Sequence, residues 1–183
     1  KNSGQSSEKK ILKIKKILLK NKFDYLFVTA PENVAWILNI RGCDSSFSPI
    51  PNARLLINNK GEMNLFSQQN KKLKIKKYFS KKLKFYGEDK IEKKLKNLWK
   101  NNILLDISSC SIYYKNLLKK NNIITEKIDP IYSLKSIKNS TEIKNMKKSH
   151  LFDGAALTKF LFWLKKNFKK KKITELSAER KLE

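Results

Sequence analysis

The chain has 183 residues, enough for one ordinary domain and part of a second, and its 40% hydrophobic content suffices for a folded core. A formal net charge of +26 invites a nucleic-acid function, but nearly all of the basic residues are lysines. The exceptions are Arg41, Arg54 and Arg180, and they form no base-reading motif of arginine forks and stacking aromatics. The charge therefore predicts solvated helix faces and weak, salt-sensitive binding to polyanions, without a specific nucleic-acid partner.

Cysteine usage and hydropathy indicate the cellular compartment. The two cysteines, Cys43 and Cys110, fit no zinc-binding spacing and predict buried or half-buried thiols in a reducing compartment. Lysines interrupt the apolar residues at 11–19, which argues against a signal peptide. The most apolar stretch, residues 155–164, has about half the length that a bilayer requires. We therefore expect a cytoplasmic protein with no membrane partner.

The first expected helix covers residues 6–20, where apolar side chains recur at helical spacing. The lysines of this helix are expected on its solvated face: Lys9, Lys10, Lys13, Lys15 and Lys16. The continuous apolar run at 25–28 predicts a strand that is buried on both faces. Pro31 suits the first turn of a helix that extends to residue 38, and Trp36 on this helix is expected in the core.

An irregular segment at 39–52 precedes a predicted hairpin, whose strands at 55–57 and 63–66 flank Asn59-Lys60-Gly61. Three helices follow, near residues 71–81, 89–100 and 110–120, and each leads to a short apolar strand. Helices that alternate with short apolar strands, with one hairpin inserted, predict an α/β fold: a mixed β-sheet flanked by helices.

Pro130 interrupts this alternation, and the segment up to residue 138 is expected to be a linker. Asn139 and Glu142 then have the spacing of a capping box, which predicts a long helix over residues 140–167. Thr174 caps a last helix, which has no stop signal before residue 183. We therefore expect the chain to be a piece of a larger protein whose chemistry lies elsewhere.

Candidate catalytic residues are scarce. His150 is the single histidine, and Asp153 lies one turn further along the same helix, with no glycine-rich elbow or oxyanion motif nearby. A helix-surface or interdomain hydrogen bond is the better interpretation of this pair. Clusters of histidine and cysteine ligands and inward-facing carboxylate pairs are also missing. The sequence therefore predicts neither a catalytic residue nor a metal ligand.

Arg41 and Asp44 flank Gly42 on the irregular segment after the second helix. Two interpretations stay open at this point. The pair could form a salt bridge within the loop, or the loop could reach a ligand or a neighbouring subunit, since binding residues favour loops on rigid scaffolds.

Three stretches together resemble one family. Residues 32–44, E-N-V-A-W-I-L-N-I-R-G-C-D, resemble the E-x-A-W-L-x-N-x-R-G-x-D segment of cytosolic Xaa-Pro aminopeptidases (aminopeptidase P). Residues 129–143 resemble the D-P-I…K-A-x-K-N-x-x-E-I interdomain junction of that family. The helices that open its catalytic domain are similar to the part of this chain that includes His150, Asp153 and residues 155–156, 160–164 and 173–178.

The resemblance implies the long, three-domain form of a creatinase-like metalloaminopeptidase of peptidase family M24. Residues 1–134 would be its non-catalytic, creatinase-like domain, and residues 135–183 would be the junction and the opening helices of a truncated pita-bread catalytic domain. The family removes the N-terminal residue ahead of proline, usually with two manganese ions or similar divalent cations. Its Asp, Asp, His, Glu and Glu ligands would lie beyond residue 183, so no cofactor is implied for this chain itself.

The resemblance also implies a peptide substrate with proline at its second position and a homodimer. On this basis Arg41 and Asp44 are candidates for the substrate entrance or for a dimer contact. An alternative from another class is a catalytically inactive pita-bread relative that binds a histone-like protein partner. The metal ligands of the downstream sequence would separate the two, and affinity for specific nucleic acids at physiological salt would favour a third class, a nucleic-acid binder.

Overall fold

The computed structural model describes residues 3–68, 82–169 and 173–182. The chain divides into two compact units, one of Gln5–Ile137 and one of Lys1–Gly4 together with Lys138–Glu183. The helix predicted near residues 71–81 lies outside the described residues.

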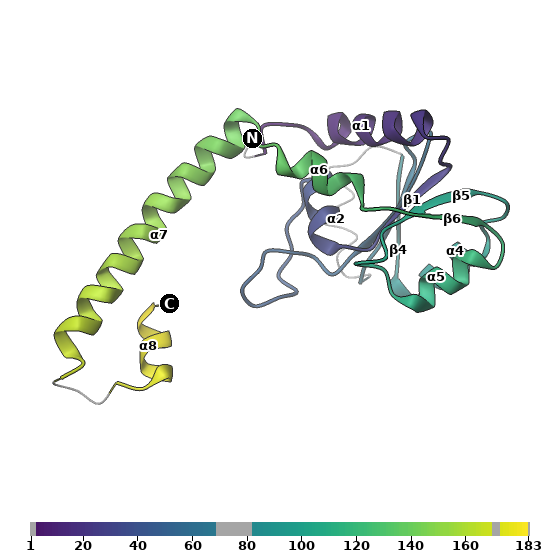
Figure 1. Cartoon of the computed structure of the whole chain (residues 1–183). Coiled ribbons are helices and arrows are strands. Elements are labelled where there is room, and N and C mark those ends of the chain that lie inside the picture. The colour runs from purple at the N-terminus through teal and green to yellow at the C-terminus, as the bar shows by residue number, and fades with distance from the viewer. Residues whose placement is uncertain (1–2, 69–81, 170–172, 183) are drawn as a thin grey trace. The chain divides into compact units, whose positions relative to one another are not determined.

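A six-stranded sheet in the order β4-β3-β2-β1-β5-β6 forms the centre of the Gln5–Ile137 unit (Figure 1). Only β2 is antiparallel to its neighbours β1 and β3, whereas the pairs β3–β4, β1–β5 and β5–β6 are parallel. The strands are β1 (Tyr25–Val28), β2 (Arg54–Asn58), β3 (Met63–Phe66), β4 (Leu83–Tyr86), β5 (Asn102–Leu105) and β6 (Ile123–Glu126). The predicted mixed sheet and the β2–β3 hairpin are thus confirmed.

Helices cover both faces of this sheet (Figure 1). One face carries α1 (Ser7–Lys20), α2 (Pro31–Leu38) and α6 (Pro130–Ser136), and the other carries α4 (Ile91–Lys96) and α5 (Ile112–Lys119). A 3-10 turn, η2 (Glu88–Lys90), precedes α4, which ends earlier than the predicted residue 100. The chain must turn there toward β5, and Lys100 adopts a positive φ of 54° in that turn.

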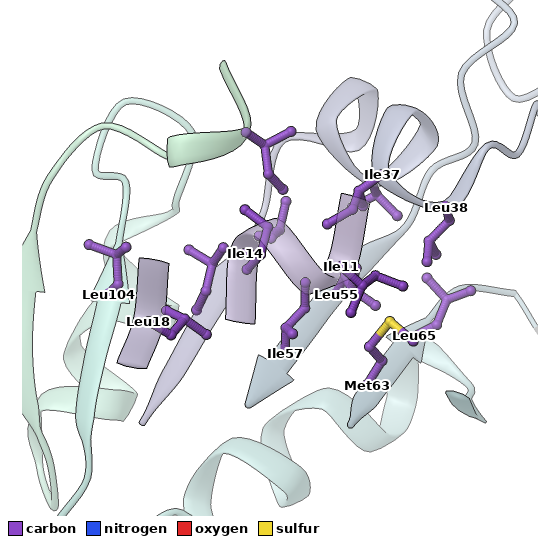
Figure 2. Close-up of a cluster of buried hydrophobic side chains, with 14 of the residues drawn as sticks. Ile11, Ile14, Leu18, Ile37, Leu38, Leu55, Ile57, Met63, Leu65 and Leu104 are labelled. Carbon is purple, nitrogen blue, oxygen red and sulfur yellow. The ribbon is translucent and has the colours of Figure 1, made fainter. Parts of the chain in front are cut away.

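Two hydrophobic clusters fill the layers, because successive side chains of a strand point to opposite faces. Figure 2 shows the first cluster, in which Ile14 and Leu18 of α1 and Ile37 of α2 meet Leu55 and Ile57 of β2. The second cluster joins Phe27, Leu56 and Leu105 on the opposite face of the sheet to Leu95 of α4 and Leu118 of α5. The central strands are therefore buried on both faces, as the apolar run at 25–28 predicted.

The linker predicted between Pro130 and residue 138 is wrong, because this segment forms α6. Pro130 occupies the first turn of the helix, where its missing N–H costs no hydrogen bond. The Asp129 side chain caps the helix by accepting a hydrogen bond from the Ile131 N–H at 2.8 Å. Ile131 is fully buried in the cluster shown in Figure 2. The proline that ended one alternation thus begins a helix that belongs to the core.

One lysine of α1 also departs from its predicted place. Lys9, Lys13 and Lys16 are exposed, but Lys10 is buried, with only 1% of its surface accessible. Lys10 lies on the face of α1 that carries Ile14 and Leu18, because residues four positions apart in an α-helix lie on the same face. Trp36, predicted in the core, is half-buried and packs against it.

The other unit contains two helices, α7 (Ser140–Asn167) and α8 (Glu175–Leu182). The predicted capping box is present at the start of α7, where Asn139 and Glu142 exchange hydrogen bonds with each other's backbone N–H groups at 2.9 and 3.0 Å. His150 and Asp153 are both exposed on α7. None of the helices among the described residues combines the length and the apolar character that crossing a bilayer requires.

Candidate functional site

The candidate residues Arg41 and Asp44 lie on the loop that joins α2 to β2, and both are exposed. Asp44 has a local structural task, because its carboxylate accepts a hydrogen bond from the Asn52 backbone N–H at 2.6 Å. This contact ties the beginning of the loop to its end. Arg41 lies three residues before Asp44. The loop therefore exposes one cationic and one anionic side chain, and the Asp44–Asn52 hydrogen bond holds its two ends together.

Gly42 completes this closure by close approach of the backbone. Its N–H donates to the Pro49 carbonyl at 3.2 Å. A Cβ at position 42 would lie 2.5 Å from the Pro51 Cα and 2.6 Å from the Pro51 nitrogen, so that a glycine is needed here for space. The tip of the loop turns through a bridge between Ser45 and Ser48. Phe47 at this tip is 84% exposed, which makes it an unusually accessible aromatic side chain.

Gly42→Ala is expected to open the loop, because the added methyl group meets backbone atoms that cannot rotate away. Limited proteolysis should therefore cut within residues 42–52 faster than in the parent protein. Gly154→Ala is the matched control, since a Cβ at that position of α7 has no neighbour within 4 Å and alanine favours a helix. Equal cleavage rates for Gly42→Ala and Gly154→Ala would refute the close-approach argument.

A buried polar network lies beside α2, the helix that precedes this loop, at the edge of the sheet where β1 and β5 end. After β1 the chain passes to α2 on one face of the sheet, and after β5 it passes to α5 on the other face. In open α/β sheets such a switch point is the usual place for a ligand. Here the side chains of the protein occupy it.

The network joins three buried residues, Asn33, Asp106 and Asp129, and one half-buried lysine. The Asn33 side-chain amide donates to Asp129 Oδ2 at 2.9 Å, and the Asp129 backbone N–H donates to Asp106 Oδ2 at 2.8 Å. Lys135 Nζ donates to Asn33 Oδ1 at 2.7 Å. These bonds fasten α6 to α2 and to the end of β5, so that the network is a structural clamp.

The two carboxylates of the clamp have opposite protonation tendencies. Burial raises the pKa of Asp129, and this effect outweighs the hydrogen bonds from the Ile131 N–H and the Asn33 amide. Burial also acts to raise the pKa of Asp106, but the hydrogen bonds from Ser108 and from the Asp129 N–H lower it overall. Asp106 is therefore the more acidic carboxyl group of the pair.

The thiols differ from the sequence-based expectation in one case. Cys110 is half-buried as predicted, and burial raises the pKa of its thiol to about 11, which makes it unreactive at neutral pH. Cys43 is exposed, because it lies on the loop between Gly42 and Asp44. The prediction of a buried or half-buried thiol is therefore wrong for Cys43.

Within residues 3–68, 82–169 and 173–182, no group of three or more histidine, cysteine, aspartate or glutamate side chains could hold a metal ion. The described residues thus do not fit a dinuclear metal site of the kind that the family resemblance implies.

Sequence reasoning missed the clamp and the burial of Lys10. A usable signal existed for the clamp, since Asp106 directly follows a buried strand and Asp129 directly precedes a proline at a helix start. A signal also existed for Lys10, since its four-residue spacing from Ile14 and Leu18 puts it on the apolar face of α1, unlike Lys9 and Lys13. Its role depends on an acceptor from α2, which lies far away in the sequence.

Residues 1–142 match the family model of the creatinase/prolidase N-terminal domain. Xaa-Pro aminopeptidase 1 of Dictyostelium discoideum is 32% identical over 188 residues, which cover 99% of this chain and 30% of that protein. A probable Xaa-Pro aminopeptidase P of Pyricularia oryzae is 29% identical over 206 residues, with 100% of this chain and 32% of that protein covered. The chain thus spans about a third of the length of the curated relatives it matches.

Solved structures agree with these relatives. The X-prolyl aminopeptidase of Caenorhabditis elegans, a cytosolic enzyme with a di-nuclear active site, matches with a TM-score of 0.85 and 25% identity, over 99% of this chain and 31% of that one. The Xaa-Pro dipeptidase of Bacillus anthracis shares the fold with a TM-score of 0.70 at 15% identity, over 97% of this chain and 48% of that one. The resemblance to Xaa-Pro aminopeptidases is confirmed, and the chain belongs to the creatinase/prolidase N-terminal domain family.

Proposed function

We propose that this chain is the non-catalytic, supporting part of a cytoplasmic Xaa-Pro aminopeptidase. In that enzyme the remainder of the protein removes the N-terminal residue that precedes a proline, with two manganese or similar divalent ions. The observation that carries the proposal is the match to Xaa-Pro aminopeptidases along 99% of this chain, in sequence and in structure. The di-nuclear site of the C. elegans enzyme supports the metal assignment.

The proposed domain division assigns residues 1–134 to the supporting domain and residues 135–183 to the junction and the opening helices of the catalytic domain. The two compact units, which meet between Ile137 and Lys138, are compatible with this division. The extensive exposed apolar surface of α7, which includes Leu151, Phe152 and Phe162, is what a helix of a larger packed domain would show.

The direct test compares the 183-residue chain with the whole protein from which it comes. With manganese and a peptide that has proline at its second position, the whole protein should release the N-terminal residue and the chain alone should not. Turnover by the chain alone would contradict the proposed division of labour. A whole protein that neither turns over the peptide nor binds manganese would instead favour the inactive relative that binds a histone-like protein partner.

Within this function we propose that the loop with Arg41 and Asp44 contacts the peptide substrate at the entrance of the site or contacts the second subunit of a homodimer. The support is geometric: the loop is exposed, it carries both charge signs, and its base is closed by the Asp44–Asn52 hydrogen bond. A preformed charged loop can engage a charged peptide terminus or a partner surface without a large ordering cost.

Arg41→Ala in the whole enzyme is expected to lower kcat/KM for an Xaa-Pro peptide about tenfold, the effect of losing one hydrogen bond from a charged group. If the loop makes a dimer contact instead, sedimentation velocity should show a weaker dimer. Lys60→Ala, at the exposed turn between β2 and β3, is the control for loss of one surface charge and should change neither quantity. Arg41→Ala with unchanged kcat/KM and unchanged dimerisation would remove this role from the loop.

A further inference from the structure

The burial of Lys10 requires an explanation, because an ammonium group is costly to remove from water unless polar groups replace its hydration. Its Nζ donates to the Trp36 carbonyl at 2.8 Å and to the Asn39 Oδ1 at 2.7 Å. The same Nζ lies 3.9 Å from the centroid of the Trp36 ring, within the range of a cation–π interaction. All of these partners belong to the last turn of α2 or to its cap.

The buried Lys10 ammonium supplies the C-terminus of α2 with a positive charge that the helix itself does not provide. The last carbonyl groups of a helix have no partners within the helix and carry partial negative charge, which a nearby cation stabilises. The last turn of α2 contains no basic residue. α1 supplies side-chain donors from one face: the Ser7 hydroxyl donates to the Ile37 carbonyl at 2.8 Å, and Lys10, one turn later, donates to the Trp36 carbonyl, which also accepts from the Asn39 N–H.

Asn39 converts this cap into a defined start for the loop. It has a left-handed backbone with φ 53°, which asparagine tolerates better than most residues. Its Oδ1 accepts from Lys10, and its side-chain amide donates to the Gln5 carbonyl at 2.8 Å. Both ends of the Asn39 amide are therefore held by the α1 side of the molecule, and Arg41 follows only two residues later.

We infer that Lys10 is a positioning residue for the loop with Arg41 and Asp44. Its buried ammonium locks the α2 C-terminus and the left-handed Asn39, and so fixes the direction in which the chain enters the loop. The entry is fixed by Lys10 and Asn39, and the base further along is closed by Gly42 with Pro49 and by Asp44 with Asn52. The contacts of this loop with a substrate or a second subunit rest on the proposed function. The role of Lys10 in holding the loop does not depend on that function.

The chain carries its own reporter for a test, because the exposed Cys43 lies between Arg41 and Asp44. In a Cys110→Ala background Cys43 is the only thiol of the 183-residue chain, so that a nitroxide can be attached to the loop alone. Lys10→Met keeps the length of the side chain and removes the charge and the hydrogen bonds. Lys13→Met, one turn further along α1 at an exposed position, is the matched control.

Lys10→Met should raise the ratio of mobile to immobile nitroxide in the electron paramagnetic resonance spectrum about tenfold, as expected for the loss of hydrogen bonds from a charged group. Lys13→Met should leave the spectrum unchanged. Asn39→Asp keeps an acceptor for Lys10 and tolerates the left-handed backbone but loses the donor to the Gln5 carbonyl, so its loop should be less mobile than that of Asn39→Gly. Asn39→Gly keeps the backbone but removes the acceptor and should loosen the loop.

The Asn39 variants keep the test decisive if Lys10→Met does not fold, because both leave Lys10 in place. Equal spectra for Asn39→Gly and Asn39→Asp, or for Lys10→Met and Lys13→Met, would overturn the lock. Activity of the whole enzyme separates this result from the proposed function. A loop that loosens in Lys10→Met while Arg41→Ala keeps full activity and an unchanged dimer would confirm the lock and refute the loop's role at the substrate entrance or in dimerisation.

Discussion

Asp129→Ala is expected to lower the free energy of unfolding of the Gln5–Ile137 unit by about 3 kcal/mol. The substitution removes the cap of α6, which is worth about 1 kcal/mol. It also leaves the side-chain amide of the fully buried Asn33 without its Asp129 acceptor, which costs about 2 kcal/mol more. Urea unfolding followed by the fluorescence of Trp36, which lies on α2 beside the clamp, measures the change.

Two further substitutions calibrate this result. Asp129→Asn keeps one carbonyl oxygen as an acceptor and should lose less stability than Asp129→Ala. Asp89→Ala removes an exposed carboxylate whose ion pair with Lys90 is also exposed, so that its effect should stay within about 0.5 kcal/mol. If Asp129→Ala were no more destabilising than Asp89→Ala, the clamp would contribute nothing to the fold.

Asp106→Asn is expected to cost about 2 kcal/mol at pH 7 and much less in acid. Asp106 Oδ1 accepts from the Ser108 N–H and hydroxyl, and Oδ2 accepts from the Asp129 N–H. An asparagine at this position has one oxygen for these donors, and its NH2 group faces the others. The loss at neutral pH is therefore that of hydrogen bonds to a charged group.

The pH dependence follows from the lowered pKa of Asp106 in the folded protein. A carboxylate with a lowered folded pKa contributes its stability above its unfolded value, near 3.8, and loses it as the pH falls through the folded pKa. Asp129 has the opposite sign, because its raised pKa means that its contribution is lost as the pH rises through the folded value. Asp129 is present in both proteins, so that the difference between them reports chiefly on Asp106.

Unfolding free energies of the parent and of Asp106→Asn, measured from pH 7 down to about pH 2, should therefore stay apart above about pH 4 and converge below it. A constant difference over this range would show that the pKa of Asp106 is not lowered in the folded protein. Asp153→Asn, at an exposed position of the other unit, serves as the control for loss of a carboxylate and should leave the pH dependence unchanged.

Local signals in the sequence predicted most of the secondary structure, because the relevant physics acts over a few residues. The apolar spacing of Ile11, Ile14 and Leu18 predicted the buried face of α1, and Asn139 with Glu142 predicted the start of α7. The error at Pro130 was also local: a proline breaks a helix in its interior but suits its first turn.

The candidate site was less accessible to sequence reasoning, because its geometry depends on contacts across the fold. Arg41 and Asp44 could be placed on a loop, but the contact of Asp44 with Asn52 depends on how that loop closes. Helical spacing puts Lys10 on the apolar face of α1, but its acceptors are 26 and 29 residues away and could not be predicted. Asn33 and Asp129, which are 96 residues apart, become partners only once the sheet has assembled.

The order of the sheet also dictates the order in which it can be completed during synthesis. β1 pairs with the antiparallel strand β2 on one side, after α2 and the loop with Arg41 and Asp44, but its other side must wait for β5, where the Asn102 N–H donates to an Asp24 side chain 78 residues earlier. Until then the most apolar strand of the sheet has an open edge, which is where nascent chains associate wrongly. A net charge of +26 makes such chains repel one another during this interval. The abundance of lysine thus opposes association between chains in which the β5 side of β1 is still unpaired.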